Sequence, residues 1–253
     1  MTMISLNQPS ANPTVRLYPE PAEVLENPAL SCYFLPLMSF THEHIQDQQE
    51  YTIHLLGTDG LSCTSPRPCA ENIIHGFQYN EGRYRYMGDP AAFGEYNNIS
   101  EVYGWLLEDF NRNSEYYLHE KISAADYGAN VQVALNSIAT FDSRRYAEGI
   151  YSYLYTKTHY QRTGEFHQMT ELTDNQLPVA DDLLLDHLTA QELGQTLLAE
   201  LPQHTQHSYN LRPEMIVGGT ERSRFMSPSG HGAILAALDP KHKEIYLLNP
   251  SAM

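Results

Sequence analysis

The sequence predicts an α+β protein that is mainly helical over its N-terminal two thirds and ends in an antiparallel sheet. Between residues 98 and 160, three segments place apolar side chains at helical spacing. The clearest of them carries one apolar face, made of Ile99, Val102, Tyr103, Leu106, Leu107 and Phe110. After residue 215, three short apolar runs separated by Gly, Pro and Asp are typical of strands, and they cover 215–217, 231–238 and 244–248.

The first 28 residues are expected to form a flexible tail, because five of the fifteen prolines fall there among polar residues. Residues 29–253 are expected to form a single α+β domain with a helical insertion around residues 98–175. Near the start of this domain, Tyr51 to Leu56 has the composition of a strand and is followed by a Gly-Thr-Asp-Gly turn.

The C-terminal elements are marked by their own boundary signals. Thr189-Ala-Gln-Glu192 has the form of a capping box and predicts a helix that runs to Leu201, before a proline. Residues 239–243 (Asp-Pro-Lys-His-Lys) predict a turn with exposed charge. The last two strands are therefore expected to pair as an antiparallel hairpin.

Composition argues against several classes of partner. The formal net charge of -16 repels nucleic-acid phosphates and anionic lipid surfaces. No apolar run approaches the roughly 20 residues that cross a bilayer. We therefore expect no nucleic-acid partner and no membrane insertion. Arg83-Tyr84-Arg85 alternates basic and aromatic side chains, as a platform for stacking nucleic-acid bases would, but we interpret it as a solvated strand edge. Three cysteines are an odd number and too few to cross-link a domain of this size, which favours a reducing compartment.

A histidine and an asparagine flank the predicted C-terminal hairpin. His231 precedes the first strand and Asn249 follows the second, so their side chains meet if they share a face. An amide oxygen that accepts from imidazole Nδ1–H leaves Nε2 able to take a proton from a nucleophile. The alternative is that both are turn residues, since His231 has glycine on each side and Asn249 precedes a proline.

A cysteine is the nucleophile that suits such a pair, and three cysteines are available. Cys69 follows Pro68, which can occupy the first position of a helix and place the thiol where the helix dipole lowers its pKa. Cys32 begins a more apolar stretch and is the alternative nucleophile, although Pro36 would interrupt a helix there. Cys63 lies in a Ser/Thr/Pro loop.

Residues 229–251 (SGHGAILAALDPKHKEIYLLNPS), with the preceding EMIVGG strand and capped helix, resemble the C-terminal sheet of papain-like cysteine peptidases. This superfamily includes secreted bacterial effectors that hydrolyse or deamidate host proteins. The resemblance implies a papain-like fold, the catalytic order Cys69, His231, Asn249, a protein substrate and delivery into a host cytosol. The papain-type Cys-Gly-Ser-Cys-Trp signature is absent, and Ser31-Cys32-Tyr33 matches part of it.

Neither a metal nor a cofactor is expected. Three groups offer metal-ligating side chains, but none supplies four ligands at zinc-like spacing: His42 with His44, His204 with His207, and Cys63 with Cys69 and His75. No phosphate-cradling glycine loop is present in the sequence.

The competing hypothesis is a protein-binding effector without catalytic activity. Its working surface would be the tyrosine-rich segment that carries Tyr146, Tyr151, Tyr153, Tyr155 and Tyr160. Half-buried packing is the commoner reason for such a stripe.

Overall fold

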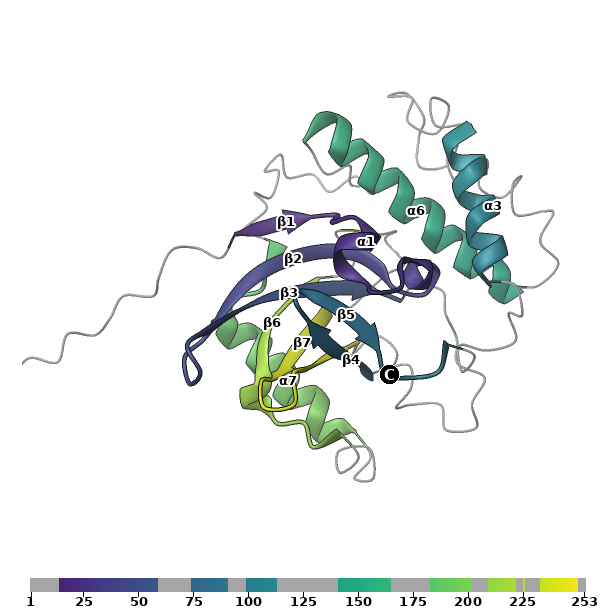
Figure 1. Ribbon diagram of the computed structural model, residues 1–253. Coiled ribbons are helices and arrows are strands. Elements are labelled where there is room, and N and C mark those ends of the chain that lie inside the picture. The colour runs from purple at the N-terminus through teal and green to yellow at the C-terminus, as the bar shows by residue number, and fades with distance from the viewer. Residues whose placement is uncertain are drawn as a thin grey trace, which may run out of the picture.

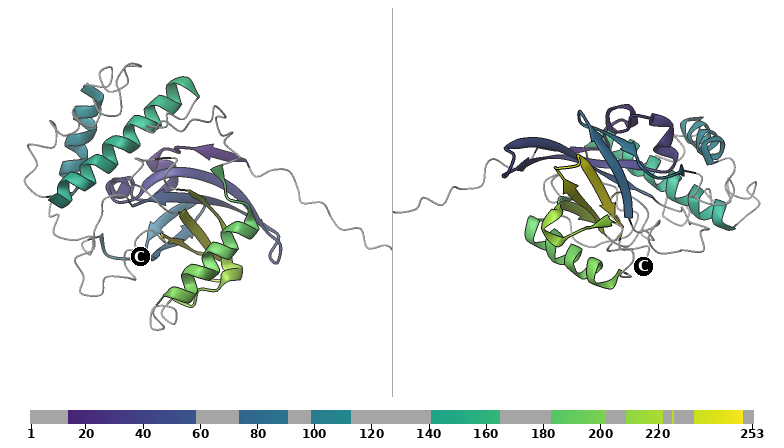
Figure 2. Two further views of the ribbon diagram at one scale, coloured as in Figure 1. Left: turned by 180° about the vertical axis from the view of Figure 1, so that it is seen from behind. Right: turned by 60° about the horizontal axis from the view of Figure 1, so that its bottom comes forward.

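The computed structural model describes residues 14–58, 74–90, 99–112, 141–164, 183–201, 209–221, 225 and 233–249. These residues form two antiparallel sheets and four α-helices. The three-stranded sheet has the order β1-β2-β3, and the five-stranded sheet has the order β5-β4-β8-β7-β6. Figure 1 shows α3 and α6 beyond the three-stranded sheet and α7 beside the five-stranded sheet, and the views from behind and below show the same arrangement (Figure 2).

The three-stranded sheet consists of β1 (Val15–Leu17), β2 (Leu35–His44) and β3 (Gln49–Gly57). A short helix, α1 (Pro21–Val24), and a 3-10 helix, η1 (Pro28–Cys32), connect β1 to β2. Residues 15–28, which we expected to lie in a flexible tail, thus contain an ordered strand and helix, and Val24 is fully buried.

The five-stranded sheet combines segments from both ends of the chain: β4 (Ile74–Asn80), β5 (Arg83–Tyr86), β6 (Ile216–Glu221), β7 (Ala233–Asp239) and β8 (Glu244–Leu248). A 3-10 helix, η4 (Pro213–Met215), precedes β6. The predicted hairpin of β7 and β8 is confirmed, with Leu235 opposite Leu248 and Asp239 opposite Glu244. β8 also pairs with β4, which places Ile74 opposite Leu248.

The expectation of a papain-like fold with a helical N-terminal two thirds is wrong. Five of the eight described strands, β1 to β5, lie before residue 87. The apolar run at the start of β2 gave no strand signal because both of its faces are buried: Leu37 and Met38, adjacent in sequence, are each fully buried. A strand covered on both faces lacks the polar and apolar alternation by which strands are identified.

Three helices cover the sheets. The helix predicted near residue 99 is α3 (Ile99–Arg112), and α6 (Phe141–Thr163) also falls within the region where we expected helices. The helix predicted before the C-terminal strands is α7 (His187–Glu200). Its cap differs from the prediction, because the side chain of Asp186 accepts a hydrogen bond from Thr189 N (3.0 Å) and α7 begins two residues before Thr189.

The two faces of the five-stranded sheet contact different cores. Alternate residues of β7 and β8, among them Ile234, Ala236 and Leu247, pack into the core that includes β2, β3 and α6. The intervening residues, among them Leu235 and Leu248, pack against α7. We call the first the inner face and the second the α7 face. None of the described helices is long and apolar enough to cross a membrane.

Candidate functional site

Asn249 is the predicted site residue that the structure describes most informatively. It follows β8 directly, and its side chain is buried, with a relative exposure of 5%. Its Nδ2 donates a hydrogen bond to Oγ1 of Thr58 (3.1 Å), the residue after β3. Its Oδ1 is buried and has no hydrogen-bond partner among the described residues. A buried acceptor without a donor costs free energy, so such an atom in a folded protein calls for an explanation.

The strand register brings several chain ends to Asn249. Thr58, the last described residue before segment 59–73, is hydrogen-bonded to it, and Ile74, the first described residue after that segment, lies opposite Leu248. On the other side, β7 begins at Ala233, and the register of Leu235 with Leu248 puts position 249 opposite Ile234 when continued by one residue. Thr58, Ile74 and the start of β7 therefore lie near Asn249, at one end of the five-stranded sheet.

Cys69 and His231, the other two members of the predicted triad, lie outside the described residues, as does Cys63. Ile74 belongs to the run from which we expected a helix after Pro68, but it is the first residue of β4. Any helix that begins at Pro68 must therefore end before Ile74.

Cys32, the alternative nucleophile, is poorly suited to form a thiolate. It ends η1, its relative exposure is 2%, and its Sγ donates a hydrogen bond to the carbonyl oxygen of Ala29 (3.1 Å). Burial raises the pKa of this thiol to about 11. Since the thiolate is the reactive form, this environment disfavours Cys32 as a nucleophile.

His75 is a neighbour of Asn249 that sequence reasoning considered only as a metal ligand. It lies on β4, opposite Leu247 of β8, and packs edge-on against Phe34, with ring centroids 5.5 Å apart. This contact places His75 on the inner face, where Asn249 also points through its bond to Thr58. The proximity of His75 to Asn249 depends on the pairing of β4 with β8, which no local sequence pattern predicts.

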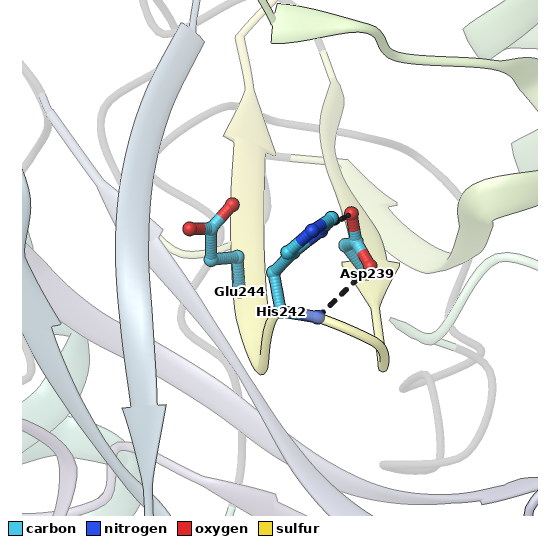
Figure 3. Close-up of side chains that lie close together, drawn as sticks. All are labelled: Asp239, His242 and Glu244. Atoms are coloured by element: carbon cyan, nitrogen blue, oxygen red, sulfur yellow. Dashed lines mark hydrogen bonds and ion pairs between the residues drawn. The ribbon is translucent and has the colours of Figure 1, made fainter.

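Asp239, His242 and Glu244 form a second cluster, at the turn between β7 and β8 (Figure 3). Their ligand atoms lie within 4.8 Å of one another. Asp239 Oδ1 accepts from the backbone N–H of Lys241 and His242, its Oδ2 contacts His242 Nδ1 (2.8 Å), and Glu244 accepts from the Tyr246 hydroxyl. These contacts account for all three side chains as parts of the hairpin turn.

The described tyrosines of α6 are packing residues. Tyr153 and Tyr155 are buried, and the Tyr153 hydroxyl donates to the carbonyl oxygen of Pro36 on β2 (3.0 Å). Tyr160 packs against the same core. The side chains of Tyr146 and Tyr151 lie outside the described residues. For the three that are described, the arrangement favours packing over an exposed partner-binding face.

Comparison of this chain with known protein families, with curated proteins and with solved structures gives no match.

Proposed function

We propose that this protein is a cysteine-dependent hydrolase or amidase that acts on a protein substrate, as a peptidase or as a glutamine deamidase. The observation that carries the proposal is the buried Oδ1 of Asn249, for which the described part of the chain supplies no hydrogen-bond donor. It lies where the described ends of the segments that carry Cys69 and His231 come together.

Chain connectivity is compatible with a nucleophile in segment 59–73. Segment 59–73 contains Cys63 and Cys69, and its flanking residues Thr58 and Ile74 both lie beside the end of β8. An extended chain spans at most about 3.6 Å per residue, so the five steps from Cys69 to Ile74 cover at most ~18 Å and the two from His231 to Ala233 at most ~7 Å. These chain lengths are compatible with Cys69 and His231 beside Asn249, and Cys63, five residues after Thr58, is equally compatible. The thiol of Cys32, in contrast, is buried with a raised pKa.

The proposed roles follow the chemistry of a thiol, an imidazole and an amide. His231 removes the proton from the Cys69 thiol, and the thiolate attacks a carbonyl or carboxamide carbon. The C–N bond breaks as His231 returns the proton to the leaving amine or ammonia. Water then hydrolyses the thioester, which releases the acid and restores the thiol. Asn249 Oδ1 accepts a hydrogen bond from the imidazole N–H and holds the ring in the tautomer that these proton transfers require.

The experiment is the pH-dependent rate of iodoacetamide labelling at each cysteine, mapped by mass spectrometry in the wild type and in His231→Ala and His75→Gln. We expect Cys69 to label rapidly well below pH 8.5, the ordinary thiol value, and to lose that reactivity in His231→Ala alone. His75→Gln is the control because His75 is the described imidazole on the same face as Asn249.

Two results would contradict the proposal in different ways. Loss of reactivity in His75→Gln but not in His231→Ala would assign the base to His75. If all three cysteines label as ordinary thiols in every variant, none of them is a catalytic nucleophile. Mass spectrometry of an incubated protein substrate then distinguishes peptide cleavage from conversion of glutamine to glutamate.

A further inference from the structure

Two histidines, His42 and His44, lie side by side near the end of β2. They are two residues apart on one strand and therefore share a face, and their ring centroids are 6.5 Å apart. Two imidazoles on one tetrahedral zinc ion, at Zn–N distances of about 2.0–2.1 Å, have centroids roughly 5 Å apart. Small side-chain rotations therefore suffice to bring both rings to one ion.

The ring of His44 is held in an orientation that suits a metal ligand. Its Nδ1 contacts Asp47 Oδ1 (2.9 Å), and a carboxylate can only accept, so Nδ1 carries the proton and Nε2 carries the lone pair. Asp47 is itself fixed, because Oδ1 also accepts from Gln49 N (3.1 Å) and Oδ2 accepts from the Tyr51 hydroxyl (2.8 Å). A histidine that binds a metal through one nitrogen commonly donates the other N–H to a carboxylate in this way.

Tertiary packing brings a third histidine towards this pair. A Cβ at Gly218 would fall only 2.6 Å from Cζ of Phe40, so the Phe40 ring lies directly against this residue of β6. The N–H of Leu185 donates to the carbonyl oxygen of Gly219, the next residue of β6 (2.8 Å). The chain thus approaches adjacent residues of β6 both from β2 and from the segment that leads into α7.

His187 is the first residue of α7, two residues after Leu185. His42 follows Phe40 by two residues on the same face of β2. The electrostatics agree with this placement, because burial lowers the pKa of His42 and the nearby charges of His187 and His44 lower it further. The neutral imidazole is the form that binds metals. His187 is exposed, so its side chain can turn towards the pair.

We infer that His42, His44 and His187 bind one divalent transition-metal ion, represented by zinc, with Asp47 as the outer partner of His44. Three histidines match the ligand set of zinc sites whose fourth position is held by water. Imidazole also suits copper and nickel ions, whereas magnesium and calcium prefer oxygen ligands. The site shares no residue with the proposed catalytic groups and does not depend on the proposed function.

The test measures zinc binding to the full-length protein one histidine at a time, because histidines and cysteines elsewhere in the chain can also bind zinc. Diethyl pyrocarbonate modification is mapped by mass spectrometry over a series of buffered zinc concentrations, and the concentration that halves modification of a histidine reports the affinity of its site. The variants are His42→Gln, His187→Gln, Asp47→Asn and His242→Gln. His242 is the matched control, because its Nδ1 also contacts an aspartate in a hairpin turn, Asp239 Oδ2 (2.8 Å).

We expect zinc to protect His42, His44 and His187 over the same range of concentration. His42→Gln and His187→Gln should each raise the half-protecting concentration at the two remaining histidines by at least about tenfold. Asp47→Asn should raise it by about 10–100-fold, and His242→Gln should leave it unchanged. Because His187 is exposed on the first turn of α7, we expect His187→Gln to unfold in urea as the wild type does when a chelator is present.

Three results would overturn the inference. If His44 and His187 keep the wild-type half-protecting concentration in His42→Gln, the three side chains do not share an ion. If His187→Gln leaves the protection of His42 and His44 unchanged, α7 contributes no ligand. If zinc protects His242 alone among these histidines, the ion binds at the turn between β7 and β8 instead.

Discussion

Replacement of Tyr84 by phenylalanine tests how the free edge of β3 is protected. Among the described strands, β3 pairs with β2 alone, so the N–H groups on its other edge need acceptors from elsewhere. The N–H of His54 donates to the Tyr84 hydroxyl (2.7 Å), and the N–H of Thr52 donates to the Tyr79 hydroxyl (3.1 Å). Both tyrosines come from the β4–β5 hairpin of the other sheet. Side-chain hydroxyls thus take the place of a neighbouring strand.

The magnitude follows from burial. Tyr84 and His54 have relative exposures of 1% and 4%, so water cannot replace the lost hydroxyl. A buried donor left without an acceptor costs about 1–3 kcal/mol. Tyr84→Phe keeps the ring and its packing, and we expect it to lower the free energy of unfolding by about 2 kcal/mol, equivalent to roughly 4–8 °C in Tm for a chain of this size.

Tyr79→Phe is the matched comparison, because its partner Thr52 is half-buried and water can satisfy the N–H. We expect a loss below about 1 kcal/mol for this variant. Urea unfolding followed by circular dichroism, with calorimetry for Tm, measures both. Equal losses for the two variants, or a Tyr84→Phe protein as stable as the wild type, would refute the idea that the Tyr84 hydroxyl protects a buried strand edge.

Three further measurements test separate parts of the structure. Since burial raises the pKa of the Cys32 thiol to about 11, its thiolate fraction at pH 8 should be at least about a hundredfold below that of an ordinary thiol, and its alkylation should be correspondingly slower. Labelling of Cys32 at the ordinary rate would contradict its burial. Desolvation lowers the pKa of His54 below 6.5, so the unfolded chain binds a proton more readily than the folded protein. The free energy of unfolding should therefore fall as the pH drops below 6.5, and it should fall less steeply in His54→Gln. If urea titrations give the same dependence of stability on pH for both proteins, His54 is not the source of the effect. Asp186→Ala should cost about 1 kcal/mol of stability and more than Thr189→Ala, and the reverse ranking would restore Thr189 as the cap of α7.

The parts of the fold that the sequence predicted are those with local signals. The apolar face of α3 repeats at helical spacing, and the turn after Asp239 separates two short apolar strands. β2 escaped prediction because neighbouring residues such as Leu37 and Met38 are both buried, which removes the alternation of a half-exposed strand. Its burial depends on α6 and the second sheet, elements that no local window contains.

The candidate site divides in the same way. The position of Asn249 after a strand was predictable from the hairpin and the following proline. The link to Thr58 was not, because it joins residues 191 positions apart and depends on how two sheets pack. The relation of His75 to Asn249 likewise depends on the crossover that places β4 beside β8. Local patterns therefore indicated a candidate residue, and tertiary structure supplied its surroundings.

The cost of the unsatisfied Asn249 oxygen leads to one more prediction, which separates stability from function. Thr58→Val/Asn249→Leu replaces a buried polar pair, one atom of which has no partner in the described part of the chain, with apolar groups of similar size. Such a replacement is close to neutral or stabilising when both partners are removed together. We expect the double variant to unfold at the same or a higher urea concentration than the wild type, while rapid Cys69 labelling is lost. A polar pair retained for function is expected to lower the stability of the fold that carries it. Destabilisation of the double variant by several kcal/mol would therefore mean that the pair stabilises the fold instead.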